Sequence, residues 1–248
     1  MSELERWRGK VALVTGASSG IGEAIARRLS QLGLHVCVTA RAEERVRALC
    51  EELGEQATPL AMDVSDERSV KNAFAQIQEK LGGLHVLVNN AGLGFEESLL
   101  EGSTERWRQM LEVNILGLCM CTREGVALMR KSEEGHVFHL GSMAGHRIAV
   151  GSNVYGATKY AVRALTESLR QELFANNLPI RVTSVSPGFV ETNFHAQYFG
   201  DENKSAELYS RQKVLEPTDI ADAVQYALGT PPHVAVHDVL VRSRHQST

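Results

Sequence analysis

The chain has 248 residues, of which 43% are hydrophobic and 23% charged, as in an ordinary globular protein of one large domain. Its net charge of −4 comes without a basic patch, which argues against nucleic acid or an acidic membrane surface as the main partner. No apolar run reaches the roughly 18 residues of a membrane span, and the four cysteines have neither disulfide nor metal-ligand spacing, so we expect a cytoplasmic protein with reduced thiols and no bound metal.

Short apolar segments alternate with amphipathic ones along the whole chain. After an N-terminal extension at 1–8, strands are predicted at 10–15, 34–40, 58–62, 84–88, 135–140, 180–185 and 236–241. Helices are predicted at 21–32, 43–53, 67–81, 104–130, 153–174 and 217–228. Strands that are apolar throughout are typical of a parallel sheet with helices on both faces. The pattern therefore predicts an α/β fold: a single doubly wound Rossmann domain over 1–248, with about seven parallel strands and a ligand site at their carboxyl ends.

The predicted helix 104–130 carries apolar side chains on more than one face. They are Trp107, Met110, Leu111, Val113, Leu116, Leu118 and Met120. A helix that is apolar all round is buried. Intramolecular core is one interpretation; because a sheet cannot cover every face of one helix, we favour a subunit interface in a homodimer or homotetramer.

A glycine-rich loop at 15–22 joins the first predicted strand to the first helix. Its spacing departs from the G-x-G-x-x-G fingerprint, but its glycines can fulfil the same three structural roles. Gly16 permits a tight turn, Gly20 lets the backbone approach a pyrophosphate, and Gly22 lets the helix pack on the strand. The N–H groups at the helix start would bind the anion, whereas a simple turn is the alternative. The predicted cofactor-binding residues of this loop are Gly16, Ser18, Ser19, Gly20, Ile21 and Gly22.

The residues after the second predicted strand select between two dinucleotides. NAD-binding proteins place a carboxylate about 20 residues beyond the glycines, but Ala40 and Arg41 stand at this place. A guanidinium can pair with a 2′-phosphate, so NADP(H) is favoured over NAD(H). The alternative for Arg41 is a solvated helix start.

Two further strand ends complete the predicted dinucleotide site. Asp63 and Val64 follow the third strand, where they could contact the adenine. Asn90, Ala91 and Gly92 follow the fourth strand, where a small residue and a glycine would admit the cofactor close to the backbone. For the Asn89-Asn90 pair, turn chemistry is the alternative.

Tyr155 and Lys159 lie four residues apart in a predicted helix, so they share one helical face. An ammonium beside a phenol favours the phenolate and should lower the pKa of the tyrosine from about 10. Tyr155 is therefore a candidate proton donor and acceptor for alcohol–ketone chemistry.

Six motifs in this order and spacing resemble those of the short-chain dehydrogenase/reductase family, from about residue 8 to the C-terminus. They are 15–22, 89–92, Asn114, Ser142, the Tyr155/Lys159 pair and 187–188. The resemblance implies that Tyr155 is the general acid, that Lys159 lowers its pKa and binds the nicotinamide ribose, and that Ser142 hydrogen-bonds the substrate oxygen.

The resemblance also implies supporting roles around the nicotinamide. Asn114 would hold a water that links the catalytic lysine to solvent. Pro187 and Gly188 would lie beneath the ring, and the backbone of Val190 and the side chain of Thr192 would meet its carboxamide. Local alternatives exist: Asn114 could bond within its own helix, Thr192 could cap a helix, and Ser142 could cap a loop.

Two subgroups of the family compete for the substrate. The stretches 151–159 and 215–220 are similar to bacterial dehydrogenases of short 3-hydroxy acids such as serine, and Arg147 could bind such an acid unless it is simply solvated. The stretches 103–110, 121–124 and 145–147 look more like animal members that act on ketosteroids, farnesol or other lipophilic carbonyls. An apolar lining for such a substrate could come from Leu93, Phe95, Met143, Phe189, Phe194, Tyr198 and Phe199.

The segment 191–214 mixes aromatic and charged residues and is predicted to form a lid over the substrate. We favour a lipophilic carbonyl or hydroxysteroid-like ketone as substrate. A dinucleotide-binding protein without turnover is the alternative from a different class, although a binder has no need of a proton donor.

Overall fold

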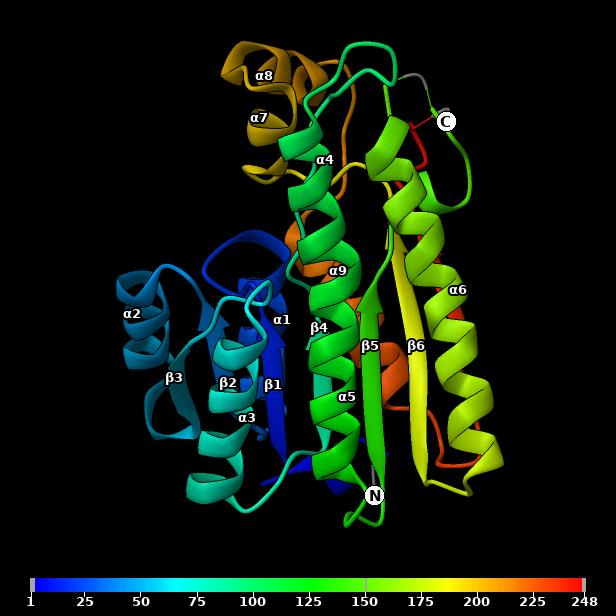
Figure 1. Cartoon of the computed structure of the whole chain (residues 1–248). Coiled ribbons are helices and arrows are strands. Elements are labelled where there is room, and N and C mark those ends of the chain that lie inside the picture. Colours follow the sequence, from blue (N-terminus) through cyan, green and yellow to red (C-terminus); the bar gives the residue numbers. More distant parts are fainter. Residues whose placement is uncertain (1–2, 150, 247–248) are drawn as a thin grey trace.

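The computed structural model describes residues 3–149 and 151–246, and Figure 1 shows them as one sheet between two layers of helices. Seven parallel strands lie in the order β3-β2-β1-β4-β5-β6-β7. The strands are β1 (Val11–Thr15), β2 (His35–Ala40), β3 (Ala57–Ala61), β4 (Val86–Asn89), β5 (Gly135–Leu140), β6 (Ile180–Pro187) and β7 (Asp238–Val241). The predicted doubly wound sheet is confirmed, and each strand ends within two residues of its predicted bounds.

The helices cover the sheet in two groups with separate apolar cores. The first core joins α1, α2 and α9 to one face, and the second joins α3, α5 and α6 to the other. The helices are α1 (Gly20–Gln31), α2 (Glu43–Leu53), α3 (Glu67–Leu81), α4 (Thr104–Leu111), α5 (Leu118–Met129), α6 (Asn153–Ala175), α7 (Phe194–Phe199), α8 (Glu202–Ser210) and α9 (Pro217–Leu228). β1, β5 and β6 are buried along their whole length, because helices cover both faces of the sheet. β1 is almost wholly apolar, whereas β5 and β6 also bury polar residues, among them His139 and Ser186.

The structure corrects the prediction of one continuous α-helix over 104–130. A π-helical segment, Glu112–Gly117, separates α4 from α5. A π turn holds one residue more than an α turn, and such turns are frequent at functional sites. The tight contact of this segment is at Gly117, where a Cβ atom would lie 2.8 Å from the Val64 carbonyl oxygen.

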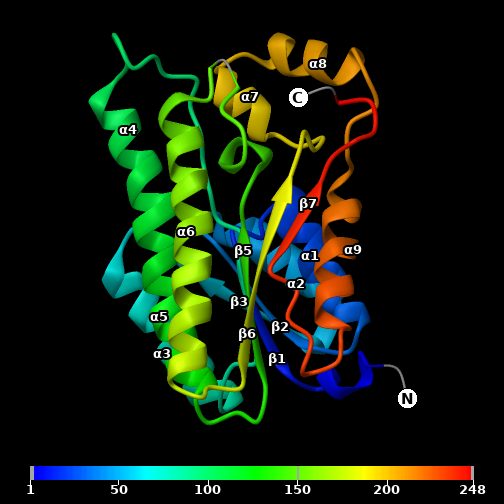
Figure 2. The same ribbon diagram turned by 90° about the vertical axis from the view of Figure 1, so that its right-hand side faces the viewer.

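The predicted lid 191–214 contains two helices, α7 and α8, that hydrophobic periodicity did not predict. Figures 1 and 2 both place them at the end of the molecule where the strands terminate. They therefore lie at the edge of the sheet where the ligand site is expected.

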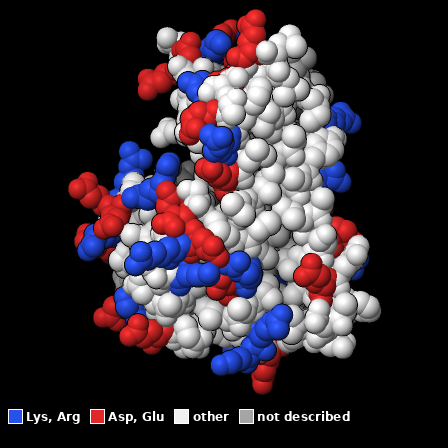
Figure 3. All heavy atoms as spheres, in the orientation of Figure 1, with Lys and Arg blue, Asp and Glu red and all other residues white. Residues whose placement is uncertain are grey.

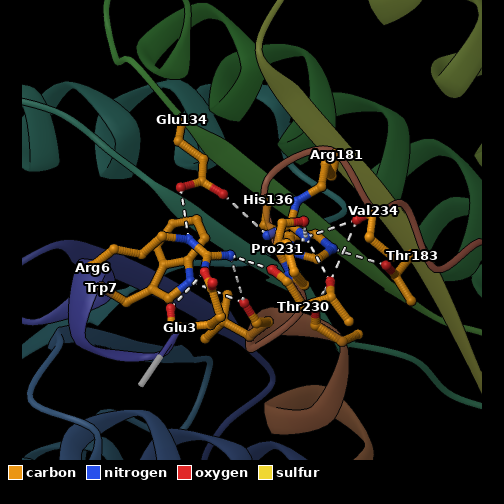
Figure 4. A network of polar contacts seen from close by, with 12 residues as sticks. Glu3, Arg6, Trp7, Glu134, His136, Arg181, Thr183, Thr230, Pro231 and Val234 are labelled. Atoms are coloured by element: carbon orange, nitrogen blue, oxygen red, sulfur yellow. Dashed lines mark hydrogen bonds and ion pairs between the residues drawn. The ribbon is translucent and has the colours of Figure 1, made fainter. Parts of the chain in front are cut away.

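The N-terminal extension is packed against the opposite end of the sheet (Figure 4). Trp7 is 1% exposed and donates from Nε1 to the Leu228 carbonyl at 3.0 Å. Arg6 and Arg181 both donate to the Glu134 carboxylate, at 2.9 and 3.1 Å. The extension thus ties the last turn of α9 to the amino end of β5. No helix in the described part of the chain is long and apolar enough to cross a membrane.

Candidate active site

The glycine loop between β1 and α1 runs against the segment that follows β4. Gly16 has φ +65°, and a Cβ atom there would lie 2.8 Å from Ala91 Cα. Gly20 has φ +59°, and a Cβ atom there would lie 3.1 Å from Thr192 Cγ2. Glycine is required at both positions, because of the positive φ and because of the close approach. The predicted loop residues, the segment after β4 and the start of the lid segment are therefore brought together.

Thr15 and Asn90 fasten the loop to the neighbouring strand. The Thr15 hydroxyl accepts hydrogen bonds from the backbone N–H groups of Asn90 and Ala91, at 3.0 and 2.9 Å. In return, Asn90 Nδ2 donates to the carbonyls of Thr15 and Gly16, at 2.8 and 3.1 Å. The predicted loop 15–22 included Thr15 but assigned it no role, although a polar residue that ends an apolar strand just before a glycine could have indicated one.

The remaining predicted dinucleotide contacts follow β2, β3 and the loop itself. Arg41 is exposed, and no side-chain hydrogen bond or ion pair of it is found in the described residues. Asp63 accepts from the backbone and hydroxyl of Ser65, at 2.9 and 2.7 Å, which is a local turn. Val64 is buried. Ser19 stands at the N-cap of α1 without a side-chain capping bond, and its side chain faces solvent.

Ser142, Tyr155 and Lys159 converge at the carboxyl end of β5. Ser142 follows the strand directly, whereas Tyr155 and Lys159 come from one face of α6. The Ser142 side chain comes close enough to the Tyr155 hydroxyl to lower the pKa of the phenol. Lys159 Nζ lies 5.7 Å from the centroid of the Tyr155 ring and donates to the Leu140 carbonyl at 2.8 Å.

The expected lowering of the Tyr155 pKa by Lys159 is not found in this structure. Burial raises the pKa of Tyr155 to about 12, against a smaller opposite effect of the Ser142 side chain. Burial also lowers the pKa of Lys159 to about 8. Desolvation of both groups thus outweighs the attraction between ammonium and phenolate, because the ammonium is directed to the Leu140 carbonyl.

Asn114 lies in the π segment and binds the chain just beyond β4. Its Nδ2 donates to the Leu93 carbonyl at 2.7 Å and to Thr158 Oγ1 at 3.0 Å, and its Oδ1 accepts from the Leu93 N–H at 2.9 Å. A Cβ atom on Gly92 would lie 3.4 Å from Asn114 Oδ1 and 3.7 Å from Lys159 Nζ. Asn114 is therefore near the lysine without a direct bond to it.

Two aromatic residues of the lid helix α7 cover Tyr155. The rings of Phe194 and Tyr198 have centroids 5.5 and 5.6 Å from that of Tyr155. All three rings meet at Gly94, where a Cβ atom would lie 2.8 to 3.0 Å from each. The Tyr198 hydroxyl donates to the Gly151 carbonyl at 2.6 Å. Sequence reasoning did not single out Gly94, because its role depends on rings that are distant in sequence.

A second aromatic cluster holds the start of the lid. The Tyr209 hydroxyl interacts with the backbone of Thr192 and with the Val190 carbonyl, all within 3.2 Å. It also contacts His195 Nδ1 at 2.8 Å, and the His195 ring packs edge-on against Phe194 and Tyr209. The sequence analysis assigned no role to His195 or Tyr209. The position of His195 among aromatic residues could have indicated that it packs in the lid.

The other predicted residues are distributed around this centre. Pro187 ends β6, Gly188 donates its N–H to the Val241 carbonyl at 2.7 Å, and Val190 is buried. The Thr192 hydroxyl accepts from the Phe194 N–H at 3.3 Å, but Asn193 is the N-cap of α7, so this bond belongs to a local turn before the helix. Arg147 is exposed. Across residues 3–149 and 151–246, no group of three or more His, Cys, Asp and Glu is arranged to hold a metal ion.

The chain as a whole is similar to several known proteins. A family model described as short chain dehydrogenase matches residues 10–203. Dehydrogenase/reductase SDR family member 11 from Bos taurus is 44% identical, over 99% of this chain and 100% of that protein. Farnesol dehydrogenase from Aedes aegypti is 40% identical, over 96% and 98%. The solved closed form of serine dehydrogenase complexed with NADP+ has a TM-score of 0.92 at 35% identity, covering 96% of each chain.

Proposed function

This chain belongs to the short-chain dehydrogenase/reductase family, and on that premise we propose that it is an NADP(H)-dependent oxidoreductase that interconverts a ketone and a secondary alcohol. The observation that carries the proposal is the meeting of Ser142, Tyr155 and Lys159 beside the glycine loop. Reduction of a carbonyl group needs a proton donor, a hydroxyl that binds the carbonyl oxygen and a nearby cation, and these three residues supply them.

The residues present fit a nicotinamide dinucleotide. Backbone at Gly16 and Gly20 is free of Cβ atoms where a pyrophosphate would approach the start of α1. The exposed guanidinium of Arg41 is available for a 2′-phosphate. Asp63 and Val64 would face the adenine. The bound nicotinamide supplies or accepts the hydride.

The nicotinamide end would be held by residues that follow β6. Pro187 and Gly188 would support the ring, while the Val190 backbone and the Thr192 side chain would bind its carboxamide. The approach of Thr192 to within contact of Gly20 supports this assignment, since it joins the two ends of the predicted site.

Each polar side chain of the site has its own role in the transfer of the proton. Tyr155, with a pKa near 12, stays protonated at neutral pH and gives this proton to the carbonyl oxygen during reduction. Ser142 hydrogen-bonds the same oxygen and stabilises its developing charge. Lys159 binds the ribose and favours the phenolate, and Asn114 holds a water between Lys159 and solvent.

We favour a lipophilic carbonyl, of the kind a hydroxysteroid-like ketone represents, as the substrate. Phe194 and Tyr198 place aromatic carbon directly over Tyr155, and the segment 191–214 serves as the lid. The similarity to farnesol dehydrogenase supports this choice. The similarity to serine dehydrogenase supports the second candidate, a short 3-hydroxy acid, for which the exposed Arg147 would be the cation.

The reaction is tested with Tyr155→Phe, which keeps the ring but removes the proton. A panel of ketosteroid, aromatic ketone, farnesal and serine is assayed with NADP(H) by nicotinamide absorbance. We expect turnover of an apolar carbonyl by the natural protein and a loss of about 10²–10⁴-fold in kcat in the variant. Wild-type kcat in Tyr155→Phe would refute the mechanism. No turnover across the panel, with the cofactor still bound, would favour the binding protein without catalysis.

The cofactor preference is tested with Arg41→Ala. We expect the KM for NADPH to rise tenfold or more, which corresponds to at least about 1.4 kcal/mol, while the KM for NADH changes little. Steady-state kinetics with each cofactor measure this. An unchanged KM for NADPH would leave Arg41 as a solvated helix start.

A homodimer or homotetramer is the assembly we propose. Figure 3 shows few charged side chains on the face that α5 and α6 form in Figure 1. Leu111 at the end of α4, Leu116 in the π segment and Tyr160 on α6 are exposed, and Phe174 near the end of α6 is 81% exposed. Exposed large apolar side chains on neighbouring helices are typical of a protein interface.

A further inference from the structure

Asp238, at the start of the edge strand β7, contacts groups on both sides of the Ser142 turn. Its Oδ1 accepts a hydrogen bond from the Ser186 hydroxyl at 3.1 Å. Its Oδ2 lies 3.2 Å from His146 Nε2 and 3.8 Å from Arg163 Nε. Figure 2 shows β7 beside β6, with α6 on the other side of that strand. One carboxylate thus joins the edge strand, the strand β6, the Ser142 turn and α6.

The turn that begins at Ser142 behaves as one hydrogen-bonded unit. Ser142 caps the 3-10 turn Met143–Gly145, with its hydroxyl accepting from the Ala144 N–H at 3.1 Å and its carbonyl accepting from the Gly145 N–H at 2.9 Å. His146 closes the unit by donating its backbone N–H to the Met143 carbonyl at 2.9 Å. A displacement of His146 is therefore passed to Ser142.

The far end of the turn is held from two directions. His146 Nε2 is buried and has no hydrogen bond in the described part of the chain, and the Asp238 carboxylate lies 3.2 Å from it. Burial lowers the pKa of His146, so at neutral pH this is a polar contact between a carboxylate and a neutral imidazole. Arg163, four residues beyond Lys159 on α6, donates to the Gly145 carbonyl at 3.0 Å. The turn also lies directly on α6, because a Cβ atom on Gly145 would come 2.6 Å from the Lys159 carbonyl oxygen.

The near end of the turn is held through β6. A Cβ atom on Gly141 would lie 2.6 Å from Ser186 Oγ and 3.1 Å from Ser184 Oγ. These two hydroxyls are 3.2 Å apart, and Ser186 donates to Asp238. Asp238 therefore orients the group against which the residue before Ser142 is packed.

We propose that Asp238 is a positioning residue for Ser142, which it holds through Ser186 behind Gly141 and through His146 at the other end of the turn. The inference rests on the proposed oxidoreductase function, in which Ser142 binds the substrate oxygen. Asp238 and His146 touch neither the substrate nor the cofactor; they act through the turn.

Because Asp238 and His146 are partly exposed to solvent, their loss should affect catalysis more than folding stability. The Asp238 side chain is 31% exposed and that of His146 is 17% exposed. The contact between them is partly open to solvent, so it contributes little to folding stability. Catalysis is far more sensitive, because a displacement of about 1 Å at a reacting group can cost about a hundredfold in rate.

Three variants and one control test the proposal. Asp238→Ala and His146→Phe remove the contact from either side, and His146→Gln keeps an uncharged polar group of similar reach beside the carboxylate. Glu167→Gln removes an ion-paired carboxylate elsewhere on α6. We expect kcat to fall at least tenfold in the first two, with the cofactor Kd and Tm close to wild type. His146→Gln should stay within about threefold of wild-type kcat, and Glu167→Gln should match wild type.

Two results would overturn the positioning role. One is wild-type kcat in Asp238→Ala or His146→Phe. The other is a loss of kcat in all three network variants, His146→Gln included, in parallel with lower Tm and weaker cofactor binding, which would make the network merely structural.

Crystal structures of the variants decide the question without turnover. The positioning role requires that the distance between Ser142 Oγ and Tyr155 Oη increases by roughly 1 Å in Asp238→Ala, and an unchanged distance overturns it. A wild-type protein that turns over no carbonyl would refute the proposed function instead. The two failures are therefore distinguishable.

Discussion

Lys159 loses its charge within an accessible pH range, because burial lowers its pKa to about 8. Its ammonium favours the phenolate that Tyr155 becomes on giving up a proton. Below pH 8 the cation is present, and above pH 8 it is lost as the group deprotonates. We therefore expect kcat/KM for carbonyl reduction, which reports the free enzyme, to be level from pH 6 to about 7.5 and to fall above pH 8.

Initial-rate assays of carbonyl reduction with NADPH, from pH 6 to 10, measure how kcat/KM depends on pH. Lys159→Arg, whose guanidinium stays charged throughout this range, should lack the descending limb even if its turnover is slow. A level profile up to pH 9.5 in the natural protein would contradict the prediction.

At the residue scale, the sequence predicted which side chains meet but not which physical effect dominates between them. The spacing of Tyr155 and Lys159 places both on one face of α6, as a helical period requires. Their pKa values depend instead on burial, to which Phe194 and Tyr198 contribute from a helix that lies some forty residues further along. The bond of Lys159 to the Leu140 carbonyl is equally a product of the tertiary structure.

At the element scale, Tyr198 connects the lid to the helix that carries Tyr155. Its hydroxyl donates to the Gly151 carbonyl, just before α6, and its carbonyl accepts from the Glu96 N–H at 2.9 Å. Tyr198→Phe removes the first bond only. Since such a bond contributes about 1 kcal/mol, we expect the KM for the carbonyl to rise about fivefold through a less closed lid, with kcat unchanged or higher.

Steady-state kinetics of Tyr198→Phe give both constants. Tyr226→Phe, on the exposed face of α9, is the matched control and should behave as wild type. A fall in kcat at constant KM would argue that the Tyr198 hydroxyl takes part in the chemical step and does not simply hold the lid.

Regular elements were predictable where apolar periodicity is strong and not where it is weak. The strand β5 and the helices α2 and α9 match their predicted bounds, because an apolar run or stripe defines each. The lid helices α7 and α8 were missed, since their aromatic residues face one another and Tyr155 instead of forming a stripe on the main core. The π segment was also missed, because its geometry depends on how Asn114 meets Leu93.

At the scale of the whole molecule, the topology followed from the alternation of apolar strands and helices, but the outer surface did not. The doubly wound parallel sheet was predicted, since parallel strands with crossover helices permit few arrangements, but the sequence analysis assigned no strand order. How the N-terminal extension docks, with Trp7 buried at the end of α9, depends on a partner more than 200 residues away. Local patterns contain no information about such a contact.

The exposed apolar face over α5 and α6 gives the last prediction. Leu116 is 52% exposed at the junction of the π segment with α5, where an interface would bury it. A stable interface removes on the order of 1,600 Å² from water, so an isolated subunit of 27.2 kDa would leave this area unfavourably hydrated. Light scattering at micromolar concentration should give a multiple of this mass, and a mass of one subunit would refute the assembly. Leu116→Arg would bury an unpaired charge and should shift the mass downward, whereas Leu100→Arg, in the turn before α4, should leave it unchanged.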